Sequence, residues 1–307
     1  MANNSSLVGG ESLLRQINYQ VIIVQILVIS FLCVNLLLIV TFFKKECFYT
    51  TARYILFAVT LMSDSLILFL SDVLLILSYL RFTMQRGMCI ALFFTVYLYF
   101  VVTPVTLTAM TLERYVAICM PLRHAELCST RSTMHFIVII HGLSSVPSIV
   151  ILAMIFSSVS ISFYKQFTVC SIEMLLVHEW QDHLRSALNQ FYFLMMCIII
   201  VFSYVKIMKV AKAASGEDKK SSGKGLKTVI LHGFQLLLSL IQLWCPFIES
   251  TILQFDFMLF VQIRYFNYLM FSLAPRCLNP LIYGLRDEKF YLELKSFGFF
   301  GLYSRNF

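Results

Sequence analysis

Long apolar runs separated by short polar connections set the pattern of the whole chain. Each run holds about 20 or more mainly apolar residues, the length that a helix needs to cross the hydrocarbon core of a bilayer. The pattern predicts an all-α membrane protein, a seven-transmembrane helix bundle. The predicted spans are about Ile17–Phe43, Tyr54–Leu80, Cys89–Arg114, Met134–Phe156, Leu184–Val210, Thr228–Ile252 and Val261–Tyr283.

The segments outside these spans are short, so a single domain is expected. Residues 1–16 are polar and are predicted to form an extracellular tail, before a bundle over residues 17–283. The first apolar run is too long for a signal peptide and is followed by lysines, so it is predicted to be a true span. Residues 284–307 mix aromatic and aliphatic residues with charges, which is typical of a short amphipathic helix lying in the interface, here a cytoplasmic helix 8 and tail.

Composition supports the membrane prediction. Hydrophobic residues make up 59% of the 307 residues and charged residues 13%, whereas soluble domains are nearer 45–50% apolar. The net charge of +8 could indicate a nucleic-acid partner. The basic residues, however, fall in loops between apolar runs, so membrane lipid and no nucleic acid is expected. Because Lys and Arg concentrate in the loops after odd-numbered spans, the amino terminus is predicted outside and the carboxyl terminus in the cytosol.

The predicted outer side carries candidate modification sites. Asn3 and Asn4 each begin an N-x-Ser sequon in the tail, so one is a candidate glycosylation site, with chance occurrence as the alternative. Of the nine cysteines, only Cys89 and Cys170 fall outside the spans on this side.

Polar residues within the spans are candidates for function, because a charge at the membrane centre costs roughly 2.5–3.5 kcal/mol on insertion scales. Asp64 lies inside the second span, and Asn35 inside the first should face the bundle to find a partner. Glu113 and Arg114 close the third span and are expected near an interface.

Several phrases carry a family resemblance. Residues 110–124 read MTLERYVAICMPLRH, residues 244–246 read Trp-Cys-Pro, and residues 280–290 read PLIYGLRDEKF. In this order, with Asp64 and Cys89 before them, the chain resembles rhodopsin-like (class A) G-protein-coupled receptors. The wording is most similar to vertebrate, fish-type odorant receptors. Trp244 departs from most odorant receptors and matches the wider class.

The resemblance implies a function in olfaction and sensory transduction. A small-molecule odorant would bind within the bundle and activate a heterotrimeric G protein of the olfactory stimulatory type at the plasma membrane. It implies a receptor rather than an enzyme, with no cofactor or metal, and a Cys89–Cys170 disulfide. It also implies an activation switch in which Glu113 restrains Arg114 at rest and two tyrosines receive it on activation. The switch residues are Glu113, Arg114, Tyr115, Tyr204, Trp244, Pro246, Asn279, Pro280 and Tyr283.

Arg276 predicts an unusual polar centre. It stands four residues before Pro280 and so lies inside the membrane. Many receptors of this fold bind sodium beside the span-two acid. We therefore predict an Asp64–Arg276 ion pair in place of that site, with Asn35 and Asn279 nearby. The alternative is that Arg276 meets only water and backbone carbonyls.

The predicted ligand site is mostly apolar. Eighteen residues before Arg114 stands Val96, where amine receptors of this fold place an aspartate, so the pocket must work differently. We predict a small, mostly apolar odorant with one or two polar groups beneath the Cys170 loop, although core packing is an alternative for each aromatic residue. Glu249 and Arg185 are possible rim charges, and Glu249 lies about 140° from Trp244 on a regular helix. The predicted ligand-binding residues are Tyr97, Phe100, Asn189, Tyr192, Trp244, Phe247, Ile248 and Thr251.

Other functional classes have weaker support. A non-olfactory class A receptor for another small ligand remains the main alternative. A seven-span transporter should contain paired repeats with broken helices, and a hydrolase a Gly-x-Ser-x-Gly or metal motif, and neither is found. His178 and His183 are one residue too far apart for the zinc motif that places both histidines on one helical face.

Overall fold

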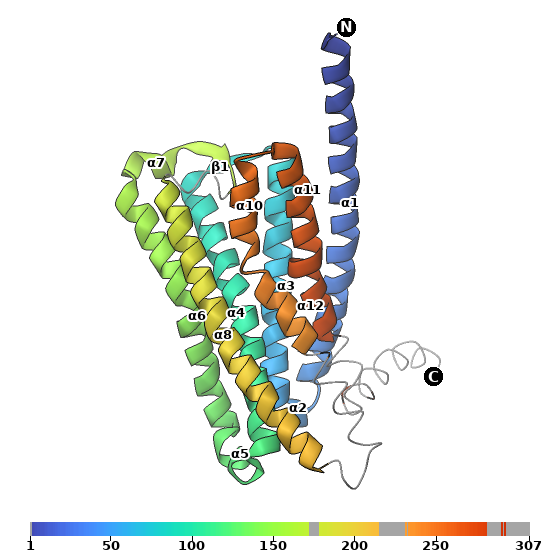
Figure 1. Cartoon of the computed structure of the whole chain (residues 1–307), viewed down its shortest axis with the longest axis vertical. Coiled ribbons are helices and arrows are strands. Elements are labelled where there is room, and N and C mark those ends of the chain that lie inside the picture. The colour runs from blue at the N-terminus through green and yellow to red at the C-terminus, as the bar shows by residue number, and fades with distance from the viewer. Residues whose placement is uncertain are drawn as a thin grey trace.

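The protein is a bundle of long helices lying side by side (Figure 1), and its computed structural model describes residues 2–171, 178–214, 231, 233–280, 290 and 292. Helix α1 begins within the segment predicted as a tail and continues through the first span. The helices and strands are α1 (Ala2–Phe43), α2 (Glu46–Tyr49), α3 (Ala52–Tyr79), β1 (Thr83–Gln85), α4 (Arg86–Cys119), α5 (Pro121–Leu127), α6 (Thr130–Ser158), α7 (Ile161–Lys165), β2 (Phe167–Val169), α8 (Glu179–Ala214), α10 (Cys245–Leu253), α11 (Phe257–Asn267), the π-helix η2 (Tyr268–Leu273) and α12 (Ala274–Asn279).

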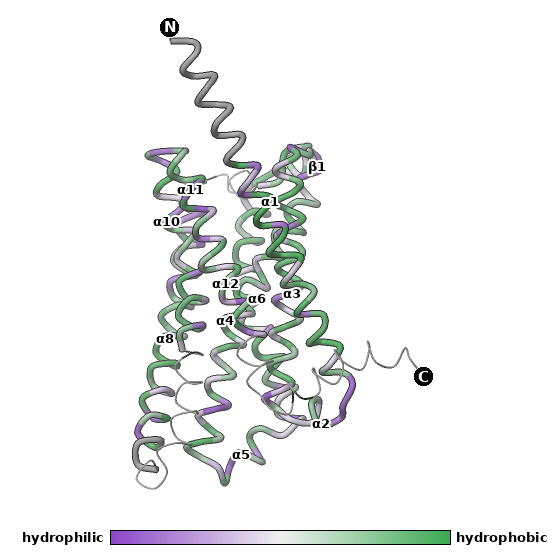
Figure 2. Tube along the Cα trace, turned by 90° about the vertical axis from the view of Figure 1, so that its right-hand side faces the viewer, coloured by the Kyte–Doolittle hydropathy of each residue, from purple (hydrophilic) through white to green (hydrophobic). Residues whose placement is uncertain are grey.

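Seven segments of the described chain are long and apolar enough to cross a membrane, which confirms the predicted seven-span bundle. Figure 2 shows hydrophobic residues along the length of the described helices, as expected of surfaces that face lipid. The seven segments are Ile17–Phe43, Ala52–Tyr79, Arg86–Cys119, Thr130–Ser158, Glu179–Val210, Gly233–Leu253 and Phe257–Asn279.

Helix α4 forms the centre of the bundle, because it packs against α3, α6 and α8. The main core gathers fully buried side chains of α3 and α4, including Leu61, Val102 and Leu107. Side chains of the first span on the lipid side, such as Ile22 and Ile26, are exposed. Apolar residues thus cover both the inside and the lipid-facing surface.

A short sheet and a disulfide close one end of the bundle. Strands β1 and β2 pair antiparallel, with Thr83 opposite Val169, and Cys89 at the start of α4 is bonded to Cys170, as the family resemblance implied. The Arg86 guanidinium adds a 2.7 Å hydrogen bond to the Gln166 side chain. The connection after α6 is therefore fixed to the beginning of α4.

The sixth span is interrupted immediately before α10. Pro246 has no N–H and its ring crowds the carbonyl four residues earlier, so the regular helix cannot pass through it. The backbone N–H groups of Leu243, Trp244 and Cys245 instead donate to carbonyls three residues before them. A helix with three residues per turn advances about 120° per residue, whereas one with 3.6 advances about 100°. Over these three residues, the difference rotates the following helix by about 60° relative to a regular α-helix.

The seventh span contains a wider turn. Residues 268–273 form the π-helix η2, which ends two residues before Pro275, and π-bulges of this kind are frequent at functional sites. Beyond Pro280 the described chain includes Phe290, which is fully buried against Phe48 and Tyr54, with ring centroids 5.0 Å and 6.4 Å away. Leu292 of the predicted helix 8 is also described and is exposed, and the rest of that segment lies outside the described residues.

Candidate ligand cavity and polar core

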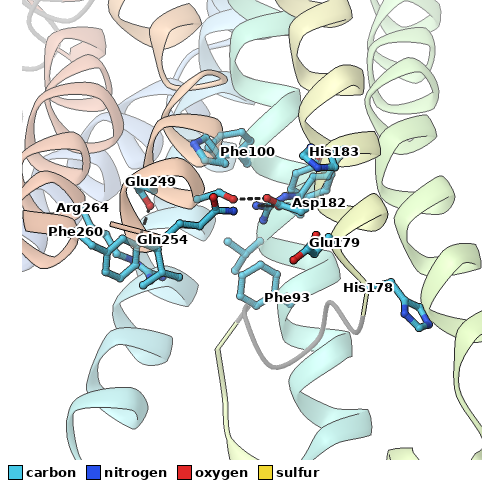
Figure 3. A pocket seen from close by; sticks show the side chains of 16 residues that line it. Phe93, Phe100, His178, Glu179, Asp182, His183, Glu249, Gln254, Phe260 and Arg264 are labelled. Carbon is cyan, nitrogen blue, oxygen red and sulfur yellow. Dashed lines mark hydrogen bonds and ion pairs between the residues drawn. The ribbon is translucent and has the colours of Figure 1, made fainter. Parts of the chain in front are cut away.

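A cavity of about 480 Å³ opens among α4, α8, α10 and α11 (Figure 3). It lies at the end of the bundle that carries the sheet and the disulfide, where α10, α11 and β1 lie at the same level (Figure 1). Its wall combines aromatic and aliphatic side chains with an unusual number of charged ones. The residues that line it are Phe93, Val96, Tyr97, Phe100, His178, Glu179, Asp182, His183, Arg185, Pro246, Glu249, Ser250, Leu253, Gln254, Phe260 and Arg264.

The α4 wall of the cavity is apolar. Phe93, Val96, Tyr97 and Phe100 lie at helical spacings of three and four, so they share one face of the helix. The rings of Tyr97 and Phe100 are nearly parallel, with centroids 6.0 Å apart. The Tyr97 hydroxyl donates a 2.7 Å hydrogen bond to the Asn189 side chain, which fixes this wall to α8.

The α8 and α10 walls are charged and joined to each other. Asp182 forms an ion pair with Arg185 one turn later, and it accepts a 2.5 Å hydrogen bond from the Ser250 hydroxyl of α10. Figure 3 shows Asp182 among the side chains that line the cavity, with a dashed line at its carboxylate. A short network of polar contacts thus holds the fifth and sixth spans together at the end of the bundle that carries the disulfide.

Glu249 contributes a second carboxylate from α10. It accepts a 3.0 Å hydrogen bond from the Asn267 amide, and its other oxygen lies 4.0 Å from Nε of Arg264. Arg264 is about half exposed, with its guanidinium 5.4 Å from the centroid of the Phe260 ring. In Figure 3 these three side chains lie together on one side of the cavity.

A polar cluster fills the centre of the bundle below the cavity. Nε of Arg276 lies 3.6 Å from an Asp64 oxygen, and both side chains are almost completely buried. Asp64 also accepts hydrogen bonds from Asn279, at 2.5 Å, and from Thr103, at 3.1 Å. Its carboxylate therefore joins α3, α4 and α12.

Arg276 has further partners in its own span and in the sixth. Its guanidinium donates to the carbonyl and hydroxyl of Ser272 and to the side-chain oxygen of Gln242, 3.3 Å away. Gln235 donates to the Asn279 side chain. Asn35 is also fully buried, but among the described residues its amide makes no hydrogen bond, so it is not a member of this cluster.

The opposite end of the bundle contains the ERY phrase. The Glu113 carboxylate lies 3.2 Å from Nε2 of His124 in α5, a partner that the sequence did not predict. Tyr204 of α8 lies beside Thr111 and within electrostatic range of Arg114. A Cβ added to Gly233 would lie 3.5 Å from the Tyr204 ring, so the sixth span packs against this tyrosine.

Nearby, Cys128 follows α5 on the same side. Partial burial raises the pKa of the Cys128 thiol above its usual value, and the negative charge of Glu113 raises it further. Tyr115 packs against Phe202, with ring centroids 5.7 Å apart. Tyr283, the last predicted switch residue, lies outside the described residues.

Comparison with known proteins accounts for this arrangement. Residues 34–283 match the family described as "7 transmembrane receptor (rhodopsin family)". The chain belongs to this receptor family. The receptor is therefore a multi-pass membrane protein and not an enzyme, and the transporter alternative is set aside.

Individual relatives refine the comparison. The receptor is 42% identical to Odorant receptor 131-2 of Danio rerio over 98% of its own length and 92% of that protein. It is 27% identical to Galanin receptor 2a of Danio rerio over 66% of its own length and 56% of the relative. Human Olfactory receptor 51V1 is 25% identical over 61% of this chain and 59% of that protein.

Only part of the predicted ligand site lines the cavity of the receptor. Tyr97 and Phe100 do, while Asn189 contacts Tyr97 and Tyr192 donates a 2.6 Å hydrogen bond to the Leu143 carbonyl of α6. The other predicted ligand residues do not belong to the cavity wall that the described residues form. They are Trp244, Phe247, Ile248 and Thr251.

The sixth span explains the difference. The prediction assumed that Trp244 faces the cavity on a regular helix, but Trp244 packs against Phe193 and Phe247, with ring centroids 5.7 Å and 6.4 Å away. The break before Pro246 also rotates α10. Glu249 and Ser250 line the cavity on this side, so its wall is more polar here than the sequence predicts. Pro246 itself predicts a bend at this point, because proline removes a backbone hydrogen bond, but it does not predict which face of α10 turns to the cavity.

Proposed function

We propose that this chain is an odorant receptor that binds a small-molecule odorant in the cavity and activates a heterotrimeric G protein of the olfactory stimulatory type. The observation that carries the proposal is the 42% identity to an odorant receptor over 98% of the chain. A volume of about 480 Å³ supports it, because small-molecule sites have volumes of roughly 300–1,000 Å³.

We infer that the amino terminus and the cavity face the outside and the carboxyl terminus faces the cytosol. The Cys89–Cys170 bond at the cavity end supports this orientation, because disulfides persist in oxidising compartments. Lys44, Lys45 and Arg123 follow the first and third spans at the opposite end. The same orientation makes Asn3 or Asn4 a glycan site, which a mobility shift on glycosidase treatment of the plasma-membrane protein would reveal.

Activation follows from the position of α10. Ligand in the cavity contacts α10 above the break at Pro246, which is a natural pivot for the inner half of the sixth span. Outward movement of that half would separate Gly233 from Tyr204 and open the surface around Arg114. Tyr115, Asn279, Pro280 and Tyr283 belong to the same switch by family resemblance, with Trp244 beside the pivot.

A cyclic-AMP reporter screen with pooled waterborne odorants tests the proposal in cells. At matched surface expression, the wild-type chain should respond to at least one pool. The variant Phe100→Ala should lose potency because Phe100 lines the cavity, while Leu112→Ala, on a lipid-exposed part of the same helix, should not. A response of equal potency in both variants would place the ligand elsewhere.

A non-olfactory class A receptor is the second candidate, supported by the 27% identity to Galanin receptor 2a. The screen separates the two when a galanin peptide is added as a further arm. Activation by the peptide and by no odorant pool would favour this alternative.

A further inference from the structure

The cavity holds more negative than positive groups. Three carboxylates, of Glu179, Asp182 and Glu249, line it with two guanidinium groups, of Arg185 and Arg264. Asp182 is already satisfied, because it pairs with the buried Arg185 and accepts from Ser250. A ligand group that displaced Arg185 would leave a buried charge without compensation, so this pair is a poor place to bind a ligand ion.

Glu249 is different in each respect. Its arginine partner is half exposed and 4.0 Å away, and exposed ion pairs of this kind contribute little. The Asn267 amide donates to one oxygen of the carboxylate, and the Arg264 guanidinium lies beside the other. Glu249 also lies within α10 and not in its first turn, so it has no role in satisfying a helix N-terminus.

Glu179 adds a negative charge to the cavity wall. Among the described residues its carboxylate has no ion-pair partner. It lies in the first turn of α8, where an acid also interacts favourably with the helix dipole. Figure 3 shows its side chain on the cavity side, between Asp182 and the edge marked by His178. Glu179 therefore contributes negative potential, while Glu249 supplies the contact.

We propose, on the basis of the odorant-receptor function above, that the ligand is a small molecule with an ammonium group, which binds Glu249 while its apolar part packs on Phe93, Val96 and Phe100. The absence of an acid at Val96 does not exclude an amine, because the carboxylate comes from α10 and not from α4. The Nε–H of Arg185 makes no hydrogen bond within the described part of the chain. A ligand oxygen near the ammonium would find a donor there.

The test uses the purified full-length receptor and ligands that differ only in their polar group. The probes are 2-phenylethylamine, phenylalanine, 2-phenylethanol and 3-phenylpropanoate. Two further series carry the same polar groups and replace the phenyl ring with a hexyl chain or a cyclohexyl ring. Affinity is measured from the rise in the unfolding temperature with ligand concentration. The ammonium members should bind on the order of 10- to 100-fold more tightly than the alcohols and carboxylates. Phenylalanine against 2-phenylethylamine distinguishes an amino acid from a simple amine.

Two variants connect the preference to one side chain. Glu249→Gln keeps the size of the group and should remove most of the preference for ammonium. Glu46→Gln removes the same charge at the far end of the receptor and should leave it unchanged. The proposal is overturned if alcohols or carboxylates bind as tightly as ammonium compounds to the wild-type receptor, a comparison that needs no variant, or if Glu249→Gln weakens all classes equally.

Failure of this proposal differs from failure of the proposed function. A neutral odorant that drives nucleotide exchange, with no ammonium preference, overturns the ligand class and leaves the odorant receptor standing. Ammonium compounds that bind through Glu249 without driving exchange support the ligand class and count against the proposed function.

Discussion

Nε of Arg276 in α12 lies 3.6 Å from Oδ1 of Asp64 in α3, with 1% or less of either side chain exposed. The pair places a permanent positive charge next to a membrane-embedded carboxylate. Asn279 and Thr103 satisfy the carboxylate further, so the cluster is nearly neutral as a whole. The pair thereby joins the second and seventh spans, which are far apart in the sequence, at the centre of the bundle.

Breaking this pair from one side should destabilise the receptor. Asp64→Asn or Arg276→Met leaves the remaining charge buried and uncompensated, at a cost of about 3–5 kcal/mol. The double variant should regain part of this loss, because no unpaired charge is left. Unfolding temperatures of the three purified variants measure the effect. Single variants no less stable than Glu126→Gln, an exposed control in α5, would show that the pair is not coupled.

Sodium should have no effect on the wild-type receptor. Because Arg276 already supplies a cation to Asp64, replacing sodium with choline at constant ionic strength should leave ligand affinity unchanged. Arg276→Met removes this positive charge, so the agonist affinity of the variant should depend on sodium. The measurement is agonist affinity for both proteins in each salt, and a clear sodium dependence of the wild type would contradict the expectation.

Cys128 offers a test of the Glu113 environment at the end of the bundle opposite the cavity. Burial and the Glu113 charge raise the pKa of this thiol, so at pH 8 it holds less reactive thiolate than an unperturbed cysteine. Glu113→Gln removes one cause, and the alkylation rate of Cys128 should rise at this pH. Peptide mapping by mass spectrometry gives the rate for this residue.

Glu126→Gln is the matched control for that rate. Glu126 lies two residues from Cys128 in sequence and is exposed, and it is not among the causes of the shift. An equal change in both variants would mean that only the overall negative charge of the loop matters.

The sequence predicted the spans well, because lipid leaves a helix few alternatives to a continuous apolar run. The sequence also predicted the pairing of Asp64 with Arg276, because two opposite charges inside the membrane each need a partner. The face of α10 was not, because three residues before Pro246 adopt a tighter turn that periodicity does not reveal. The His124 partner of Glu113 was missed for a similar reason. It depends on how α5 turns back after α4.

The central claim is that a ligand bound in the cavity activates a G protein, and that Arg114 is needed for this activation. Nucleotide exchange by purified olfactory stimulatory G protein, with agonist and receptor in lipid nanodiscs, tests it most directly. We predict that agonist accelerates exchange with the wild-type receptor and that Arg114→Ala reduces the acceleration at least about tenfold, equivalent to about 1.4 kcal/mol, while agonist still raises its unfolding temperature. Undiminished exchange with Arg114→Ala would contradict the account.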